Sequence, residues 1–223
     1  MENTCDERVL EKIRKVSNRA GLFITLEGGE GAGKSTAAAG LAALMRAEGF
    51  DVVQTREPGG TPGAEAIRTL LLSTDIALAP LAQTMLHFAA RADHVETLIS
   101  PALARGAVVI CDRYYDSTMA YQAYGMGVAV DEVAALIRLI NLRPDVTFML
   151  QVPETVSKYR LASRGAASDR YEDMGGDVMA RIAHGFAAIA AAEPERCAVI
   201  DATQQPGAVV EAMRQIIRAR TSR

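Results

Sequence analysis

The stretch that most constrains the fold is residues 22–36, LFITLEGGEGAGKST. It opens with an apolar run of strand length, breaks into a glycine-rich turn and ends on a lysine and two hydroxyl residues. Gly28 stands four residues before Gly33-Lys34-Ser35, which is the spacing of a phosphate-binding loop. Backbone N–H groups and the following helix N-terminus surround an anion in such loops. We therefore predict nucleotide binding, with Lys34 at the outer phosphates and Ser35 on Mg²⁺. A plain glycine-rich turn with a solvated lysine is the less favoured alternative.

Strand-like and helix-like segments alternate along the rest of the chain. This alternation predicts an α/β fold, a five-stranded parallel sheet flanked by helices, whose ligands bind beyond the carboxyl ends of the strands. The expected strands are residues 22–26, 51–55, 107–111, 145–151 and 197–200. The expected helices are residues 34–48, 64–72, 81–105 with a kink or step at Pro101, 131–142, 177–192 and 206–220.

Charge and cysteine content narrow the class of protein. The net charge of −3 argues against a broad basic surface for nucleic acid. No apolar run reaches the roughly 18–20 residues that span a membrane, and residues 1–20 lack the apolar segment of a secretory signal. Cys5, Cys111 and Cys197 are scattered, which predicts a reduced cytoplasmic protein with the latter two in the core. Residues 1–20 are either a short amphipathic helix or an extension.

Charged side chains follow two further predicted strands. Asp112 comes directly after the apolar run 107–111, where an aspartate either orients Mg²⁺ opposite Ser35 or caps a helix. Arg113 beside it can grip a phosphate through its planar guanidinium. Arg56 begins the sequence REPGG after another strand. We favour a functional role for Arg56 over a surface ion pair because it converges on the same sheet edge.

Two other segments allow both a structural and a functional interpretation. The basic run of Lys158, Arg160, Arg164 and Arg170 is either a solvated helix face or a lid that carries an arginine into a phosphoryl-transfer site.

The predicted helix 81–105 places His87 and Arg91 on one face, and Phe88 is expected in the core. Arg91 is either a surface residue or a group that addresses a nucleobase carbonyl. Some of the clustered tyrosines could line a base pocket with Gln122, or all could be structural; the four are Tyr114, Tyr115, Tyr121 and Tyr124.

Four segments together form a pattern that is specific to one family. They are residues 27–36 EGGEGAGKST, 55–61 TREPGGT, 112–114 DRY and 143–145 RPD, and they resemble bacterial thymidylate kinases. The resemblance runs from about residue 22 to the C-terminus and leaves residues 1–20 as an N-terminal extension. It implies the phosphate-loop nucleoside monophosphate kinase architecture for residues 21–223, with a lid near residues 160–176. It also implies transfer of the ATP γ-phosphoryl group to thymidine monophosphate, which gives the diphosphate.

The resemblance implies roles on both sides of the transferred group. Lys34 and Ser35 would hold the ATP phosphates and Mg²⁺, with Asp112 at the metal. Arg56 would bridge the acceptor phosphate and the transferred group, and Arg113 would hold the acceptor monophosphate. The loop around the ATP phosphates comprises Gly28, Gly29, Glu30, Gly31, Ala32, Gly33, Lys34, Ser35 and Thr36.

The same resemblance implies a base pocket. Arg91 would address the thymine ring, Thr118 and Gln122 its polar edge, and Tyr121 the sugar–base region, while Glu30 would lie near the nucleotide sugar. The family usually has a phenylalanine four residues before the base-reading arginine, and here that position is His87. Either His87 stacks on thymine, or a helix distortion brings Phe88 round.

An acid at Glu30 implies that catalytic positive charge comes from the lid, because the other subtype of the family has an arginine in this loop. Arg170, within the sequence DRYE, is the first choice and Arg164 the second. The resemblance further implies a homodimer packed through long helices, including residues 81–100. Another nucleoside or nucleotide kinase, or a non-catalytic nucleotide-binding module, is less favoured because Lys34, Arg56 and the REPGG sequence are all present.

Overall fold

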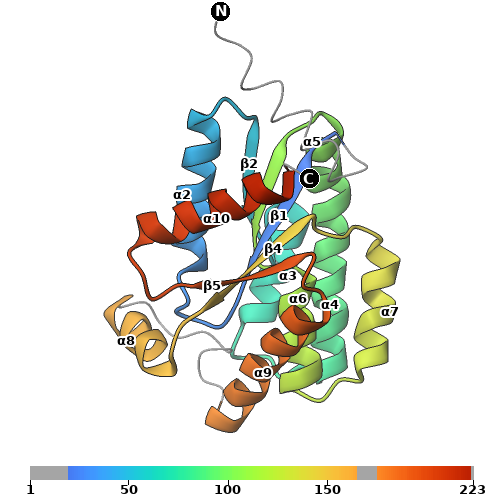
Figure 1. The fold of residues 1–223 in the computed structure, drawn as a ribbon. Coiled ribbons are helices and arrows are strands. Elements are labelled where there is room, and N and C mark those ends of the chain that lie inside the picture. Colours follow the sequence, from blue (N-terminus) through green and yellow to red (C-terminus); the bar gives the residue numbers. More distant parts are fainter. Residues whose placement is uncertain (1–19, 165–174, 222–223) are drawn as a thin grey trace, which may run out of the picture.

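The computed structural model describes residues 20–164 and 175–221, and its centre is a five-stranded parallel sheet (Figure 1). The order of the strands is β2-β3-β1-β4-β5, so the strand that leads into the phosphate loop lies in the middle. This confirms the predicted fold class. The strands are β1 (Leu22–Glu27), β2 (Val52–Arg56), β3 (Val108–Asp112), β4 (Val146–Gln151) and β5 (Cys197–Asp201).

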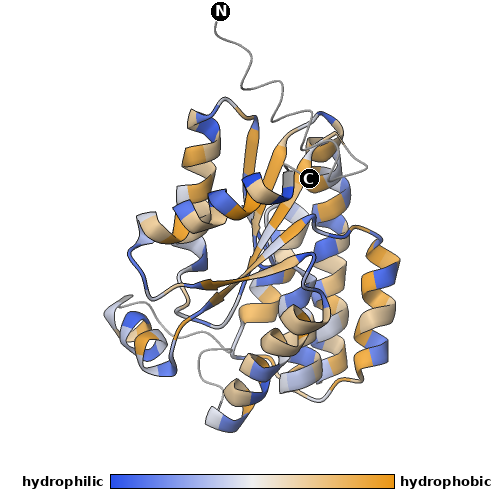
Figure 2. Cartoon of the chain, viewed as in Figure 1, coloured by the Kyte–Doolittle hydropathy of each residue, from blue (hydrophilic) through white to orange (hydrophobic). Residues whose placement is uncertain are grey.

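One face of the sheet is covered by α2 (Lys34–Ala47) and α10 (Pro206–Thr221) (Figure 1). Side chains alternate across a strand, so Leu22, Ile24 and Leu26 of β1 all pack on this face. Most strand residues are accordingly apolar, and the polar residues of these helices face outward (Figure 2).

The other face carries the remaining packed helices and two smaller apolar clusters. Phe23 of β1 points to this side, as do the buried thiols of Cys111 and Cys197, which confirms both cysteines as core residues. The helices here are α3 (Pro62–Leu72), α4 (Pro80–His94), α5 (Ser100–Ala104), α6 (Tyr115–Thr118), α7 (Val130–Ile140) and α9 (Gly176–Ala192).

The predicted helix 81–105 is present in three sections. Between α4 and α5 lies the π-helical segment η1 (Val95–Ile99), in which the backbone hydrogen bonds span one more residue than in an α-helix. Pro101, which lacks an N–H donor, stands in the first turn of α5. The expected step therefore takes the form of a π-turn placed just before the proline.

The helical segment formed by α6 and η2 (Met119–Gly125) was not predicted from the sequence. The segment mixes good helix formers, such as alanine, with tyrosine, serine, threonine and glycine, whose helix propensity is modest or poor, so local preference gave a weak signal. Packing against α9 explains the difference: the rings of Tyr121 and Phe186 are 6.1 Å apart, and a Cβ atom on Gly185 would lie 2.8 Å from the Tyr124 ring.

The helix α8 (Glu154–Arg164) follows β4 and begins next to Pro153, as expected. Residues 165–174 lie outside the described part of the chain. Arg170 and most of the predicted lid fall within this undescribed segment. The interpretation of residues 1–20 also falls almost wholly outside the described part. Within residues 20–164 and 175–221, no helix combines the length and apolar character needed to cross a membrane.

Candidate active site

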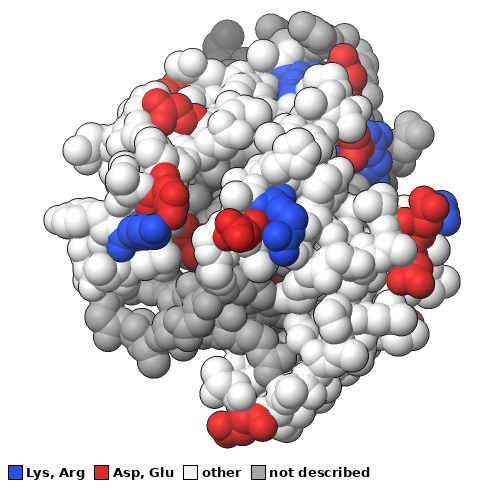
Figure 3. Space-filling view, turned by 90° about the horizontal axis from the view of Figure 1, so that it is seen from below, with Lys and Arg blue, Asp and Glu red and all other residues white. Residues whose placement is uncertain are grey.

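A cavity of about 630 Å³ opens at the carboxyl edge of the sheet, where the phosphate loop, the turn after β2, α4 and η2 meet. It brings together Lys34, Arg56, Arg91 and Arg113, which are up to 79 positions apart in the chain (113 − 34). Figure 3 looks onto this edge and shows acidic and basic side chains next to one another in the part not covered in grey. The visible part of this face therefore shows no extended basic patch.

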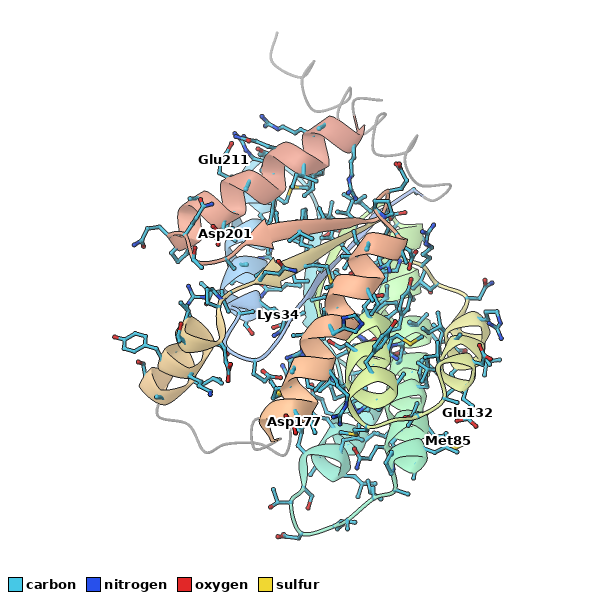
Figure 4. All side chains as sticks on the ribbon, turned by 60° about the horizontal axis from the view of Figure 1, so that its bottom comes forward. Lys34, Met85, Glu132, Asp177, Asp201 and Glu211 are labelled. Atoms are coloured by element: carbon cyan, nitrogen blue, oxygen red, sulfur yellow. The ribbon has the colours of Figure 1, made fainter. Side chains whose placement is uncertain are left out.

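The phosphate loop has the backbone that its glycines allow. Gly28, Gly31 and Gly33 adopt φ values of 135°, 71° and 90°, and a Cβ atom on Gly28 would lie 2.4 Å from the Leu150 carbonyl oxygen. The buried Lys34 Nζ donates to the carbonyl oxygens of Gly28 and Gly29 at 3.1 and 2.7 Å. Lys34 is labelled in Figure 4 at the start of α2. Burial lowers the pKa of Lys34 to about 8, with a further lowering from Arg113.

Ser35 and Asp112 both line the cavity and contact each other. The Ser35 hydroxyl donates to Asp112 Oδ2 at 2.5 Å, while the buried Asp112 Oδ1 has no hydrogen-bond partner in the described part of the chain. A hydroxyl and a carboxylate are hard oxygen ligands of the kind that Mg²⁺ prefers. The unsatisfied buried oxygen shows that this pair of residues fits a divalent cation.

Arg113 adopts a left-handed backbone conformation, with φ of 69°, which is uncommon for a residue other than glycine. Its guanidinium donates to the Gly28 carbonyl at 3.0 Å and the Ser117 hydroxyl at 2.9 Å, and it forms a short ion pair with Glu30. Burial alone would lower the pKa of Arg113, but Glu30 raises it above the ordinary value. The turn after β3 thus presents a fully charged group beside the phosphate loop.

Glu27 is a buried acid for which the sequence predicted no role. Its carboxyl oxygens accept from the Tyr114 N–H at 2.7 Å and from the Ser117 hydroxyl at 2.5 Å, so it holds the turn that carries Arg113. Burial, and then the neighbouring Asp116, raise the pKa of Glu27 to about 8. Only the tertiary structure brings these groups together, since Ser117 is 90 positions away in the chain.

Arg56 is about half exposed, and it forms an ion pair with Glu65 at 2.8 Å. Glu65 Oε1 also accepts a hydrogen bond from the Gly60 N–H at 2.9 Å. This bond lowers the pKa of Glu65; burial opposes the shift, and the positive charge of Arg56 adds to it. Arg56 lines the cavity as well. The surface ion pair and the place at the sheet edge, weighed as alternatives from the sequence, are therefore both present.

The other end of the cavity is lined by Arg91 and the polar side chains of α6 and η2. Arg91 is 2% exposed, which excludes the alternative that it is a surface residue. Its Nε donates to Glu57 at 2.7 Å and its Nη2 to Thr118 at 3.1 Å. Tyr121 and Gln122 also line this end.

His87 lines the cavity, whereas Phe88 packs in the apolar cluster beside the sheet, as its predicted core position required. The geometry thus places the imidazole, and not the phenyl ring, at the end of the cavity lined by Arg91. Burial lowers the pKa of His87 to about 3, with further lowering from Arg91, so the ring is neutral. Of the four clustered tyrosines, Tyr114 and Tyr121 contribute to the cavity lining.

Arg160 of α8 is a cavity residue that sequence reasoning included only in the basic run. Its Nη2 donates to the Ala202 carbonyl at 2.9 Å, and its Nη1 lies 3.4 Å from the Ala32 carbonyl. Lys158 of the same run is exposed and pairs with Glu154 at 2.6 Å, as a solvated helix face does. The side chains of Arg164 and Arg170 lie outside the described part of the structure.

Comparison with known proteins gives one consistent result. A family model described as thymidylate kinase matches residues 26–213. The chain belongs to the thymidylate kinase family. Members of this family use ATP to convert thymidine monophosphate to the diphosphate. The family match also agrees with the phosphate-loop kinase fold.

Individual thymidylate kinases match along most of their length. One from Gluconobacter oxydans is 51% identical over 201 residues, which cover 88% of this chain and 94% of the relative. One from Caulobacter vibrioides is 46% identical, with 88% and 96% covered. A crystal structure of thymidylate kinase from Ehrlichia chaffeensis is 32% identical, with a TM-score of 0.72, and the match covers 88% of this chain and 98% of that one.

Proposed function

We propose that this chain transfers the γ-phosphoryl group of ATP to thymidine monophosphate inside the cavity at the carboxyl edge of the sheet. The observation that carries the proposal is the meeting of a phosphate loop with the buried Arg91 and the partly buried Arg113 in one cavity of about 630 Å³. A cavity of this size suits small-molecule ligands, and its cations suit phosphate groups.

The phosphate half of the cavity is the phosphate loop, residues 28–36, together with Arg56, Asp112, Arg113 and Arg160. Its loop N–H groups and Lys34 would surround the ATP phosphates. Ser35 and Asp112 would hold Mg²⁺, which when bound supplies charge neutralisation between phosphate oxygens. Arg113 would hold the acceptor monophosphate, with Glu30 as the partner that fixes its guanidinium.

The base half of the cavity consists of His87, Arg91, Thr118, Tyr121 and Gln122. Arg91 would donate to a thymine carbonyl, and Thr118 and Gln122 would meet the polar edge of the base. The neutral His87 ring would stack on the base, while Tyr121, whose hydroxyl lies 3.2 Å from Glu30, would contact the sugar–base region.

The chemistry needs no side-chain nucleophile, because an oxygen of the acceptor phosphate attacks the γ-phosphorus directly, the bond from that phosphorus to the β-phosphate oxygen breaks, and ADP leaves. The chain contributes positioning and charge neutralisation. Lys34 and Arg56 would exchange their present oxygen partners, two backbone carbonyls and Glu65, for phosphate oxygens. Arg170, or as second choice Arg164, would add the lid arginine.

The domain bounds, the lid, the cellular location and the dimer are proposed from membership of the family. Residues 21–223 form the kinase domain with a lid near residues 160–176, residues 1–20 form an extension, and the enzyme is cytoplasmic. A homodimer would pack through α4, where the apolar Leu81 and Met85 are 43% and 58% exposed; Met85 is labelled in Figure 4.

The test is turnover of ATP with thymidine monophosphate, compared with the other nucleoside monophosphates, by wild type and Lys34→Ala. We expect thymidine monophosphate to be preferred and the variant to lose about a hundredfold or more in kcat. Near-normal turnover by Lys34→Ala would contradict the mechanism, and a preference for another base would reassign the substrate. Nucleotide binding without phosphoryl transfer would indicate a non-catalytic module.

A further inference from the structure

Glu57 lies between the end of β2 and α4, and both of its carboxylate oxygens are engaged. Oε2 accepts from Arg91 Nε at 2.7 Å, and Oε1 lies 3.0 Å from His94 Nδ1. All three side chains are buried, with exposed fractions of 3% or less. Glu57 therefore links Arg91 of the base half to a second side chain that does not line the cavity.

His94 continues this chain of hydrogen bonds. Since a carboxylate only accepts, His94 Nδ1 carries the hydrogen toward Glu57, while His94 Nε2 lies 2.7 Å from the Thr55 hydroxyl, within hydrogen-bond distance. A Cβ atom on Gly60 would lie 2.6 Å from His94 Nε2 and 2.5 Å from Thr55 Oγ1. The second glycine of REPGG is thus where the turn after β2 packs closely against His94.

The Arg91 guanidinium is held from several sides. In addition to Glu57, it donates to Thr118 at 3.1 Å and lies over the rings of Phe88 and Tyr114, at 4.7 and 5.1 Å from their centres. Its remaining nitrogen, Nη1, is buried and has no hydrogen-bond partner in the described part of the chain. A buried donor without a partner is costly, so the arrangement leaves one donor for a ligand that enters the cavity.

We propose that Glu57 and His94 are positioning residues that hold Arg91 in the orientation with which it selects the nucleobase. Glu57 fixes the orientation of the Arg91 guanidinium through a direct ion pair. His94 in turn fixes the Glu57 carboxylate by contacting its other oxygen, Oε1. The inference rests on the proposed role of Arg91 in the base half. It assigns a purpose to Glu57 and Gly60 of the REPGG sequence, next to the phosphate role of Arg56.

The proposal predicts that recognition of the acceptor's base changes and that affinity for ATP does not. Thymidine monophosphate presents a carbonyl where deoxycytidine monophosphate presents an amino group, and only the carbonyl can accept from Arg91. A loosened Arg91 should therefore bind thymidine monophosphate less well and discriminate less between these two substrates. The phosphate half, which does not contact His94, should keep its affinity for ATP.

The experiment compares His94→Leu, His94→Gln and Thr55→Val, with His184→Leu as the matched control because His184 is exposed on α9. For His94→Leu we expect KM for thymidine monophosphate to rise about tenfold, kcat and KM for ATP to change less than threefold, and the preference over deoxycytidine monophosphate to fall about tenfold. His94→Gln, whose amide nitrogen can donate to Glu57, should recover most of both losses. Thr55→Val should show the same changes in smaller measure, and His184→Leu none.

Two outcomes would overturn the proposal: equal increases in both KM values, or unchanged discrimination in His94→Leu that thermal unfolding shows to be folded. If His94→Leu does not fold, Thr55→Val and His94→Gln provide the test. The proposal would then be contradicted if Thr55→Val kept the wild-type discrimination between the two substrates while His94→Gln lost it. Failure of the proposed function would look different, since wild type itself would then fail to prefer thymidine monophosphate.

Discussion

The two halves of the cavity hold their arginines in different ways. In the base half, Arg91 and Glu57 form an ion pair whose side chains are 2% and 3% exposed. In the phosphate half, Arg56 and Glu65 form a pair of similar length whose side chains are 54% and 40% exposed. An exposed pair contributes little to stability, whereas breaking a buried pair leaves an uncompensated charge that costs several kcal/mol.

This difference in burial matches the roles proposed for the two arginines, which are base recognition for Arg91 and phosphoryl transfer for Arg56. Separating Arg91 from Glu57 would cost several kcal/mol, so the position of Arg91 is fixed before a substrate enters. A fixed donor suits selection of a base by hydrogen bonds. Arg56 can exchange Glu65 for phosphate oxygens at little cost, which suits a cation that follows a moving phosphoryl group. The following predictions separate these two behaviours.

Removal of the buried acid should have the largest effect on stability. We expect Glu57→Ala to lower the free energy of unfolding by about 3–5 kcal/mol, because Arg91 is left buried without its counter-charge. Urea unfolding measures this loss. The control is Glu132→Ala, an exposed acid of α7 labelled in Figure 4, which should change the free energy of unfolding by less than about 0.5 kcal/mol. Equal small losses in both variants would show that the base half is not held as described.

Removal of the exposed arginine should affect turnover and leave stability unchanged. We expect Arg56→Ala to lower kcat about a hundredfold while the free energy of unfolding changes by less than about 0.5 kcal/mol. Arg105→Ala is the matched control, since Arg105 forms a similarly exposed pair with Asp51, at 3.0 Å, and does not line the cavity. If Arg56→Ala and Arg105→Ala retained equal turnover, Arg56 would have only the surface ion pair.

A second buried acid sharpens the comparison, because Glu27 is bonded to the Ser117 hydroxyl and the Tyr114 N–H and not to an arginine. Burial raises the pKa of Glu27 from 4.5 to about 8, so between these values the folded state binds more protons than the unfolded state. Its contribution to stability is therefore present below about pH 4.5 and is lost as the pH rises through about 8, by at most about 1.4 kcal/mol per pH unit.

The Glu27→Gln variant isolates this contribution because it cannot titrate. We expect the difference in unfolding free energy between pH 5 and pH 7.5 to be larger for wild type than for Glu27→Gln, with wild type less stable at the higher pH. Parallel pH profiles of the two proteins would mean that Glu27 is ionised throughout and is held by Arg113.

Local sequence patterns were sufficient for the sheet and for the phosphate loop. Strands such as residues 22–26 and 107–111 are buried on both faces and are apolar except for Thr25, which is a strong signal. The spacing of Gly28 and Lys34 is equally local. The α6–η2 helix was missed because Tyr, Ser, Thr and Gly interrupt its better helix formers and weaken the local signal, and packing against α9 stabilises it.

The partners of the arginines could not be predicted in the same way. Glu57 and Arg91 are 34 positions apart, and Glu27 and Ser117 are 90 apart, so no periodicity joins them. Whether Arg91 was a surface group or a base reader depended on its burial, which the sequence left open. For Arg160 a signal existed, because it stands four residues before Arg164 in the basic run, but its contact with the phosphate loop depends on how α8 folds back.

The most direct test is a structure of the enzyme with thymidine monophosphate bound. We expect Arg91 to keep its bonds to Glu57 and Thr118 while its Nη1 lies about 2.7–3.2 Å from a thymine carbonyl oxygen. We expect Arg56 in the same structure to have left Glu65 for the acceptor phosphate. An Arg91 that has parted from Glu57, or an Arg56 that stays on Glu65, in this structure would contradict the division between a fixed base half and an exchangeable phosphate half.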